Sequence, residues 1–161
     1  MERYAWSALI VLGLLLLQTT FVPLLSLGGF VPDLLLIWVV FTAIRYGQIE
    51  ATVTGFVVGL LTDVTTTQFF GLAALSKTVG GFCAGYFYNE NKTDQTLGTY
   101  HFIMIVLTCS LVHNAVYYLI FFQGAGGPVL WNVIQYSIAT AIYTGAISAL
   151  PMFAFSRRVT T

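Results

Sequence analysis

Long runs of apolar residues without any charge restrict the fold of this chain more than any other feature of its sequence. A run of about 20 apolar residues is long enough to cross the hydrocarbon core of a membrane as a helix. Of the 161 residues, 58% are hydrophobic and 7% are charged, and the mean hydropathy is +0.87. A soluble domain of this size cannot bury so much apolar surface. We therefore expect a membrane protein built from helices, because lipid offers backbone polar groups no other partners.

Clusters of glycine, proline and polar residues divide the chain into six apolar segments. We predict one integral-membrane domain over residues 1–161, with an all-α fold of six transmembrane helices. The first segment is expected to be retained, because no small-residue cleavage site follows it. The predicted spans cover about residues 4–22, 31–46, 49–65, 70–88, 102–122 and 129–155.

The distribution of basic residues supports six spans with both termini in the cytoplasm. With that topology, all three outer loops lack Lys and Arg, as the preference of these residues for cytoplasmic loops requires. Fusing the second and third segments would give five spans instead. The fused helix would carry Arg45, Gly47 and Glu50 near the bilayer centre, where each charge costs at least about 2.5 kcal/mol. Six spans are therefore preferred, and Lys77 is then the one basic residue left inside a span.

Charge and residue types exclude several classes of function. The formal net charge is zero, which gives no basis for nucleic-acid binding. Cys83 and Cys109 lie in apolar runs and are expected to be packed side chains, not a disulfide or a metal site. The polar residues that could serve in catalysis are Asp33, Asp63, Lys77, His101, His113 and Asn114. They form no paired carboxylates, no His-x-x-x-His and no phosphate loop, so we expect neither an enzyme nor a cofactor.

Two of these polar residues, His113 and Asn114, lie in the middle of the fifth predicted span. Polar side chains at such a depth commonly form hydrogen bonds between helices. We expect that role for this dipeptide.

Glycines and charges follow a helical period in the third and fourth segments. Gly55, Gly59 and Asp63 are spaced at i, i+4 and i+8, and so are Lys77, Gly81 and Gly85. An antiparallel hairpin centred on Phe70 would pair Asp63 with Lys77, Gly59 with Gly81 and Gly55 with Gly85. The glycines would permit close backbone approach, and the charges would neutralise each other near the outer face. The alternative is that Asp63 caps a helix end and Lys77 extends to the membrane surface.

The segment from Val31 to Phe87 resembles the rod shape-determining protein MreD family. The resemblance rests on a Pro-Asp pair that opens an apolar span, a glycine in a short cytoplasmic turn, and the Gly-x-x-x-Gly-x-x-x-Asp pattern. It extends through a Gly-Leu, Ala-Leu stretch to a glycine-rich end. The residues concerned are Pro32, Asp33, Gly47, Gly55, Gly59, Asp63, Gly71, Leu72, Ala74, Leu75, Gly80, Gly81 and Gly85. The family pattern does not include a lysine at position 77 and often has Asn where this chain has Ala73.

The resemblance implies a non-enzymatic scaffold of the bacterial cell-elongation complex in the inner membrane. Its expected partners are MreC, a single-span periplasmic protein, together with MreB and the RodA–PBP2 peptidoglycan synthase, reached directly or indirectly. The family fold is similar to the substrate-binding subunits of energy-coupling-factor vitamin transporters, and such a subunit is the alternative function. That alternative requires small residues on the first span, whereas bulky leucines dominate there.

A partner span requires a groove, and we expect one between the first and sixth spans. Both of these spans are long and apolar. Leu12 and Leu16 are the residues predicted to line it.

Overall fold

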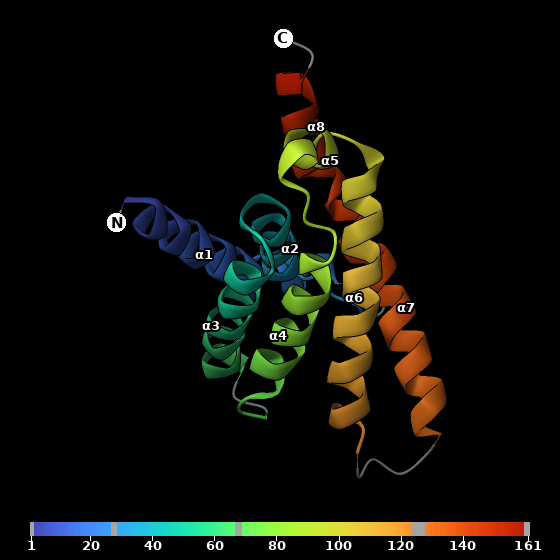
Figure 1. The fold of residues 1–161 in the computed structure, drawn as a ribbon. Helices are drawn as coiled ribbons and strands as arrows, with labels where there is room; N and C mark the ends of the chain where they lie inside the picture. The colour runs from blue at the N-terminus through green and yellow to red at the C-terminus, as the bar shows by residue number, and fades with distance from the viewer. Residues whose placement is uncertain (1, 27–28, 67–68, 124–127, 160–161) are drawn as a thin grey trace.

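The computed structural model describes residues 2–26, 29–66, 69–123 and 128–159, and the regular elements in these ranges are helices, as predicted. Figure 1 shows their arrangement. Six longer helices lie close to the six predicted apolar segments, and a short helical pair follows the fourth of them. In chain order the elements are α1 (Glu2–Thr20), η1 (Val22–Leu25), α2 (Leu34–Tyr46), α3 (Gln48–Thr66), α4 (Leu72–Gly85), η2 (Glu90–Lys92), α5 (Thr93–Leu97), α6 (Tyr100–Phe121), α7 (Val129–Ile147) and α8 (Ala149–Val159).

The second and third predicted segments form two helices and not one fused helix. α2 ends at Tyr46 and is followed by Gly47, whose φ of +95° is a left-handed conformation that residues with a Cβ rarely adopt. α3 begins directly afterwards, at Gln48. The glycine therefore reverses the chain between two helices with almost no connecting loop.

Helices α3 and α4 pack against each other so closely that glycine is required at the contact. A Cβ added at Gly59 would lie 2.4 Å from the Cα of Ala74, and one added at Gly81 would lie 2.5 Å from the carbonyl oxygen of Ala51. A Cβ at Gly55 would lie 2.4 Å from the carbonyl oxygen of Lys77. Figure 1 shows the two helices side by side over their length. The glycine pattern thus creates close backbone contact.

The register of this hairpin differs from the predicted one. Gly55 faces Lys77 and Gly59 faces Ala74, so the paired numbers sum to 132 or 133 and not to 140. The difference of seven to eight corresponds to a slide of about 11 Å, or two helical turns. Two turns bring the same helix faces together again, which is why the prediction found the right faces with the wrong partners.

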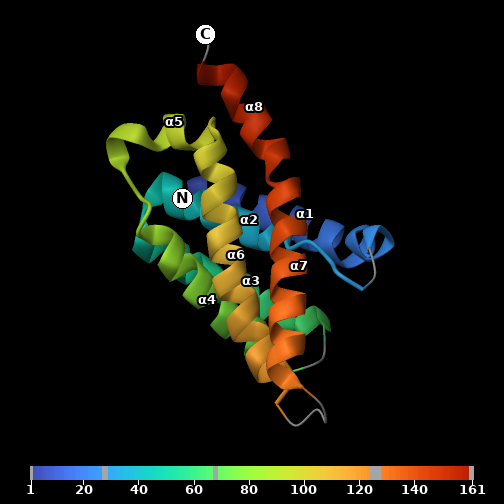
Figure 2. The same ribbon diagram turned by 90° about the vertical axis from the view of Figure 1, so that its right-hand side faces the viewer.

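The sixth predicted span is divided into two helices. α7 ends at Ile147, and α8 begins at Ala149. Pro151 has no N–H to donate to the carbonyl of Ile147, so a continuous helix would lose a hydrogen bond there, whereas proline is tolerated in the first turn of α8. Figures 1 and 2 show α8 projecting beyond the end of α6, beside α5.

Among the described residues, four helical stretches are long and apolar enough to cross a membrane, and α2 is a shorter apolar helix. With 14 residues, α4 is about 21 Å long, which is less than a typical hydrocarbon core. The chain is therefore a helical membrane protein by length and composition, and six spans remain a prediction. The four stretches are Tyr4–Leu24, Gln48–Thr66, Tyr100–Phe121 and Val129–Ala154.

Helix α1 runs across the direction of α6 and α7, as Figures 1 and 2 show from two sides. It contacts the rest of the protein through Val11 and Leu15, which pack with Leu35, Val39 and Val58 in one of two hydrophobic clusters. Most of its remaining apolar side chains are exposed. The second cluster lies between α2, α4 and α6.

Candidate functional site

Three ionisable side chains from three helices meet inside the protein. The carboxylate of Asp33, which caps α2, accepts a hydrogen bond from Nζ of Lys77 on α4 through Oδ2. Nε2 of His113 on α6 lies 3.4 Å from the same oxygen. Asp33 is 9% exposed, and Lys77 and His113 are each 3% exposed. We call these three residues the ionic cluster.

The local sequence fixes the Asp33 carboxylate in place. Pro32 favours an extended chain before the helix, and Asp33 is a preferred N-cap residue. Its Oδ1 accepts a hydrogen bond of 2.9 Å from the backbone N–H of Leu36. Its own backbone N–H donates to Oγ1 of Thr144 on α7, at 3.1 Å. Through Asp33, the cluster therefore connects α2, α4, α6 and α7.

Gln18 on α1 strengthens the same junction. Its side-chain Nε2 donates to the carbonyl of Pro32, and its Oε1 accepts from the backbone N–H of Leu34, both at 2.9 Å. The amide thereby satisfies two backbone groups on either side of Asp33. As a result, the end of α1 is fixed to the beginning of α2.

The ionic cluster is close to neutral, because the ammonium of Lys77 offsets the carboxylate of Asp33. A single charge in this buried position would be costly, whereas a paired and hydrogen-bonded one is tolerated. Ionisable residues at membrane depth commonly mark a functional position. Here the arrangement can fix four helices relative to one another.

The predicted pair between Asp63 and Lys77 is wrong, since Asp63 instead caps α4. The carboxylate of Asp63, 5% exposed, accepts hydrogen bonds from the backbone N–H groups of Gly71, Ala73 and Ala74 at 2.9–3.0 Å. These amides lie at the amino end of α4, where unpaired N–H groups and the helix dipole favour an anion. These three amide donors fill the hydrogen-bonding capacity of the Asp63 carboxylate without a cation. Lys77 is therefore available to pair with Asp33.

Gly71 has a specific backbone role in this cap. Its φ of +96° is left-handed, so a residue with a Cβ would be strained there. That conformation directs the chain from α3 into α4 and presents the Gly71 N–H to Asp63. The alternative interpretation was therefore correct in making Asp63 a helix cap, although the helix it caps is the next one. It was wrong in extending Lys77 to the membrane surface, because Lys77 is buried and pairs with Asp33.

The other predicted polar residues have separate environments. Nδ2 of Asn114 donates to Oγ of Ser110 at 3.0 Å, within α6. His113 contacts another helix, as expected of that dipeptide, whereas this bond of Asn114 stays in its own helix. His101 stacks on Tyr100 at the exposed beginning of α6, with ring centroids 4.3 Å apart. Cys83 and Cys109 are free thiols, and the described residues contain no group of three metal-ligating side chains.

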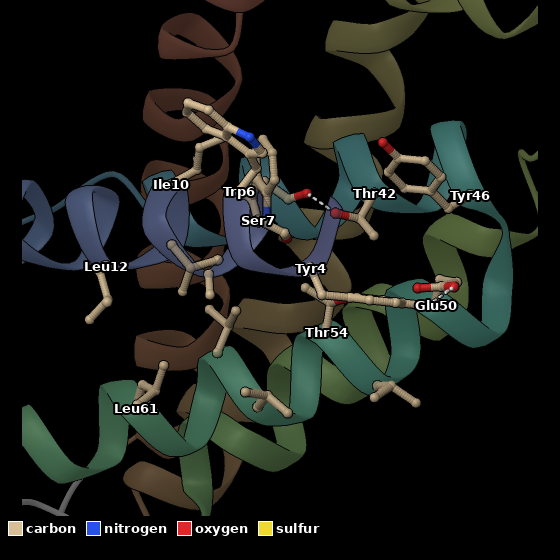
Figure 3. Close-up of a pocket in the computed structure, with 16 residues that line it drawn as sticks. Tyr4, Trp6, Ser7, Ile10, Leu12, Thr42, Tyr46, Glu50, Thr54 and Leu61 are labelled. Atoms are coloured by element: carbon tan, nitrogen blue, oxygen red, sulfur yellow. Dashed lines mark hydrogen bonds between the residues drawn. The ribbon is translucent and has the colours of Figure 1, made fainter. Parts of the chain in front are cut away.

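Two grooves flank α1. The larger, about 700 Å³, lies between α1, α2 and α3, and the smaller, about 450 Å³, lies between α1, α2, α6 and the α7–α8 junction. Figure 3 shows the larger groove, with Leu12 and Leu61 along it and the hydrogen bond of 3.2 Å between Tyr4 and Glu50 at its polar end.

Leu12 and Leu16, which were predicted to line the partner groove, differ in their positions relative to these two grooves. Leu12 lines the larger groove, while Leu16 is not among the described residues lining either one. The α1 residues beside the α7–α8 junction are Ile10 and Leu14. The first and sixth predicted spans therefore do share a groove, but not through the leucines that were predicted.

The sequence alone did not reveal the ion pair between Asp33 and Lys77. It also did not reveal the hydrogen bonds that Gln18 and Thr144 form beside this pair. The available signal was the count of charges inside the apolar segments. Apart from Arg45 and Glu50, which lie beside the Gly47 turn, the segments contain two acids, Asp33 and Asp63, and a single lysine. One of the two acids therefore needed another partner. A helix amino end immediately follows the Asp63 turn, which could have identified that acid as the cap.

The model of a family described as rod shape-determining protein MreD matches residues 2–159. No curated protein matches the chain, and no solved structure does.

Proposed function

Because the chain belongs to the rod shape-determining protein MreD family, we propose that it is a non-enzymatic scaffold of the cell-elongation complex in the bacterial inner membrane. In this role it links MreC, MreB and the RodA–PBP2 synthase and so maintains cell shape. The observation that carries the proposal is the family match over nearly the whole chain. That match places the protein in the rod-shape system as a membrane protein, which its long apolar helices support.

The proposed topology has six spans with both termini in the cytoplasm, in a fold similar to energy-coupling-factor substrate-binding subunits. Its support is the one-sided distribution of basic residues. In this arrangement the Gly47 turn and the segment containing η2 and α5 face the cytoplasm. Arg45, which lies beside the Gly47 turn, forms an ion pair of 2.5 Å with Asp94 of α5. Such a pair is expected if the two segments lie on the same side of the membrane.

The ionic cluster serves this scaffold role by holding the helices in one arrangement. A scaffold must present the same surface to its partners each time, and loosely packed membrane helices would not. The neutral pair of Asp33 and Lys77 satisfies its polar groups only when α2 and α4 are correctly placed. Thr144 on α7 and His113 on α6 also contact Asp33, so these two helices must be correctly placed as well.

The larger groove beside α1 is the proposed binding site for the membrane span of an MreC-like partner. Its walls are mainly apolar, and they include Leu12 of α1 together with Val57 and Leu61 of α3. Leu12 is 54% exposed and Val57 49% exposed, so both have contact surface left to bury against a further helix. Membrane helices associate through such packing.

The test is copurification of the full chain with MreC from native membranes, using paired tryptophan variants. Leu12→Trp and Val57→Trp fill the larger groove and should reduce the recovered MreC several-fold. Leu16→Trp is the matched control, since it adds the same bulk to α1 outside either groove, and it should recover MreC normally. An equal loss for Leu12→Trp and Leu16→Trp would place the contact elsewhere on α1. Recovery of a bound vitamin without MreC would refute the scaffold function itself.

A further inference from the structure

Buried polar side chains occupy the contact between α6 and α7, and the ionic cluster lies at one end of them. Figures 1 and 2 show the two helices side by side. Each of these polar residues is at most 5% exposed, and we call them the polar layer. They are Ser110, His113 and Asn114 on α6, and Ser137, Thr140 and Thr144 on α7.

The polar layer follows a single face of each helix. On α7 its members are spaced at i, i+3 and i+7, and on α6 at i, i+3 and i+4, which are the spacings of residues on one face. A buried helix face in a membrane protein is ordinarily apolar, since polar side chains in the membrane interior are costly and commonly have a function. The polar layer therefore requires an explanation beyond helix packing.

The hydroxyl of Ser137 shows that bonds within the protein do not satisfy the polar layer. It is buried and has no hydrogen-bond partner among the described residues. An exposed hydroxyl on α6, that of Thr108, instead donates to a carbonyl of its own helix at 2.9 Å. Thr140 makes a long contact of 3.5 Å with the hydroxyl of Tyr118. Buried polar groups that lack a protein partner are normally bound by water, which forms about three hydrogen bonds in such sites.

Tyrosines extend the polar layer to one end of α6. Tyr118 lies close to the end of this helix at Phe121, and its ring centroid is 5.4 Å from that of Tyr136 on α7. Both side chains are half-buried, so each combines an apolar ring with a hydroxyl that can bind water. This end faces the outer side in the topology proposed above. At the other end, Thr144 accepts the hydrogen bond from the backbone N–H of Asp33.

At that inner end, two donors lie beside one carboxylate oxygen. Oδ2 of Asp33 accepts from Lys77, and Nε2 of His113 lies 3.4 Å from it. This separation exceeds the 2.7–3.2 Å of a typical N–H···O bond, so the contact has room to shorten when the imidazole gains a proton and becomes a charged donor. The other titratable group beside the imidazole is Tyr117 of α6, with ring centroids 6.2 Å apart. From α7, Thr144 is uncharged.

We propose that the polar layer binds a line of water molecules that connects the outer side of the membrane to the ionic cluster, where His113 takes up a proton. A hydronium ion in this line gives its proton to an imidazole nitrogen and remains as water. The charged ring then competes with the ammonium of Lys77 for Oδ2 of Asp33, which shifts the contact of Asp33 from α4 toward α6. The proposal uses the proposed topology to identify the outer side. It is independent of which proteins the scaffold binds, because every readout reports on the chain itself.

Silver ions test the line of water, because they bind thiolates and reach them only through water. The full chain carries Cys83→Ser and Cys109→Ala, with Ser137→Cys or Thr140→Cys added singly. Both added thiols should react with silver supplied outside intact cells at least about ten times faster than that of Ile138→Cys, because a thiol in lipid does not ionise. Ile138→Cys is the matched control, since Ile138 adjoins Ser137 but is 46% exposed on the outside of the protein. Reaction is measured as the loss of maleimide labelling after denaturation.

Two substitutions at Ser137 test the order of residues along the line. Ser137→Leu fills the part of the polar layer nearer the outer side and should slow the reaction of Thr140→Cys several-fold. Ser137→Ala removes the hydroxyl without adding bulk and should leave that reaction fast. Equal rates for Ser137→Cys, Thr140→Cys and Ile138→Cys, or reaction only from the cytoplasmic side in inverted vesicles, would overturn the proposed line of water.

The proton is followed by NMR of the purified full chain carrying His101→Gln, which leaves His113 as the single histidine. Its ring signal should change with pH between about 4 and 8 while the helix content stays constant. Spin labels at Leu75 of α4 and Leu119 of α6, which are both exposed, should report a change of distance over the same pH range. His113→Gln should abolish this change, and His101→Gln should preserve it. A His113 signal that is constant in the folded protein, or a distance change that persists in His113→Gln, would overturn proton uptake at this site.

Discussion

Removing the charge of either Asp33 or Lys77 alone should destabilise the protein more than removing both charges together. Asp33→Asn keeps a good N-cap for α2 but leaves the Lys77 ammonium, which is 3% exposed, without its counter-charge. Breaking a buried pair in this way costs about 3–5 kcal/mol. Lys77→Met leaves the carboxylate with the Leu36 N–H and His113, so its loss should fall at the lower end of that range.

The double variant Asp33→Asn with Lys77→Met removes both charges and retains the cap. It loses mainly one hydrogen bond to a charged group, about 1.5–3 kcal/mol. The sum of the two single losses is about 6–8 kcal/mol, so the two sites should be coupled by at least 3 kcal/mol. The free energies of unfolding are measured by titrating detergent-solubilised protein with a denaturing detergent, with helix content as the signal.

The matched control for this double-mutant cycle combines Asp63→Ala with Lys77→Met. Asp63 bonds to backbone amides of α4 and not to Lys77, so these two losses should add. Independent sites add within about 0.5 kcal/mol. Additivity of the Asp33 and Lys77 losses within that limit, or strong coupling of Asp63 with Lys77, would refute the assignment of the pair.

Three further predictions follow from the fold. Asp63→Ala should cost about 3 kcal/mol, because two buried amides and the part-buried amide of Gly71 lose a charged acceptor at about 1–3 kcal/mol each. Asp63→Asn should cost less in the same unfolding assay. Gly59→Ala should destabilise the hairpin by about 1–3 kcal/mol, since its Cβ meets the Ala74 backbone. Gly13→Ala has open space around it inside α1, so it should cost nothing and should stabilise the helix by up to about 1 kcal/mol in thermal unfolding. For topology, a cysteine at Lys92 should resist an impermeant thiol reagent in intact cells, and labelling there would contradict six spans. Cysteines that should be labelled from outside are those at Leu27, Gln68 and Gly126, which lie outside the described residues.

Much of the helix pattern could be predicted because it depends on local chemistry. The positive φ of Gly47 is a backbone requirement of one residue, and the sequence marks it with a glycine between two apolar runs. Asp33 similarly identifies the beginning of α2, because an acid after a proline and before an apolar run is a typical N-cap. The division of the last span at Pro151 was missed, although the same local reasoning on the missing N–H would have found it.

The pairing of helices could not be predicted, because periodicity specifies a face and not a position along it. The glycines of α3 meet α4 equally well after a slide of two turns. What selects the observed register is the amino end of α4, whose free N–H groups must lie beside Asp63. That requirement involves the connection between the helices, and the apolar pattern contains no information about it.

The two buried acids show how the environment of a carboxylate decides its partner. Asp63 lies where the chain turns into a helix, so neutral amides and the helix dipole satisfy it without a cation. Asp33 also caps a helix, but the cap uses only Oδ1, and Oδ2 points toward α4 and α6. A buried, negatively charged carboxylate oxygen requires a positively charged partner, and the ammonium group of Lys77 supplies it.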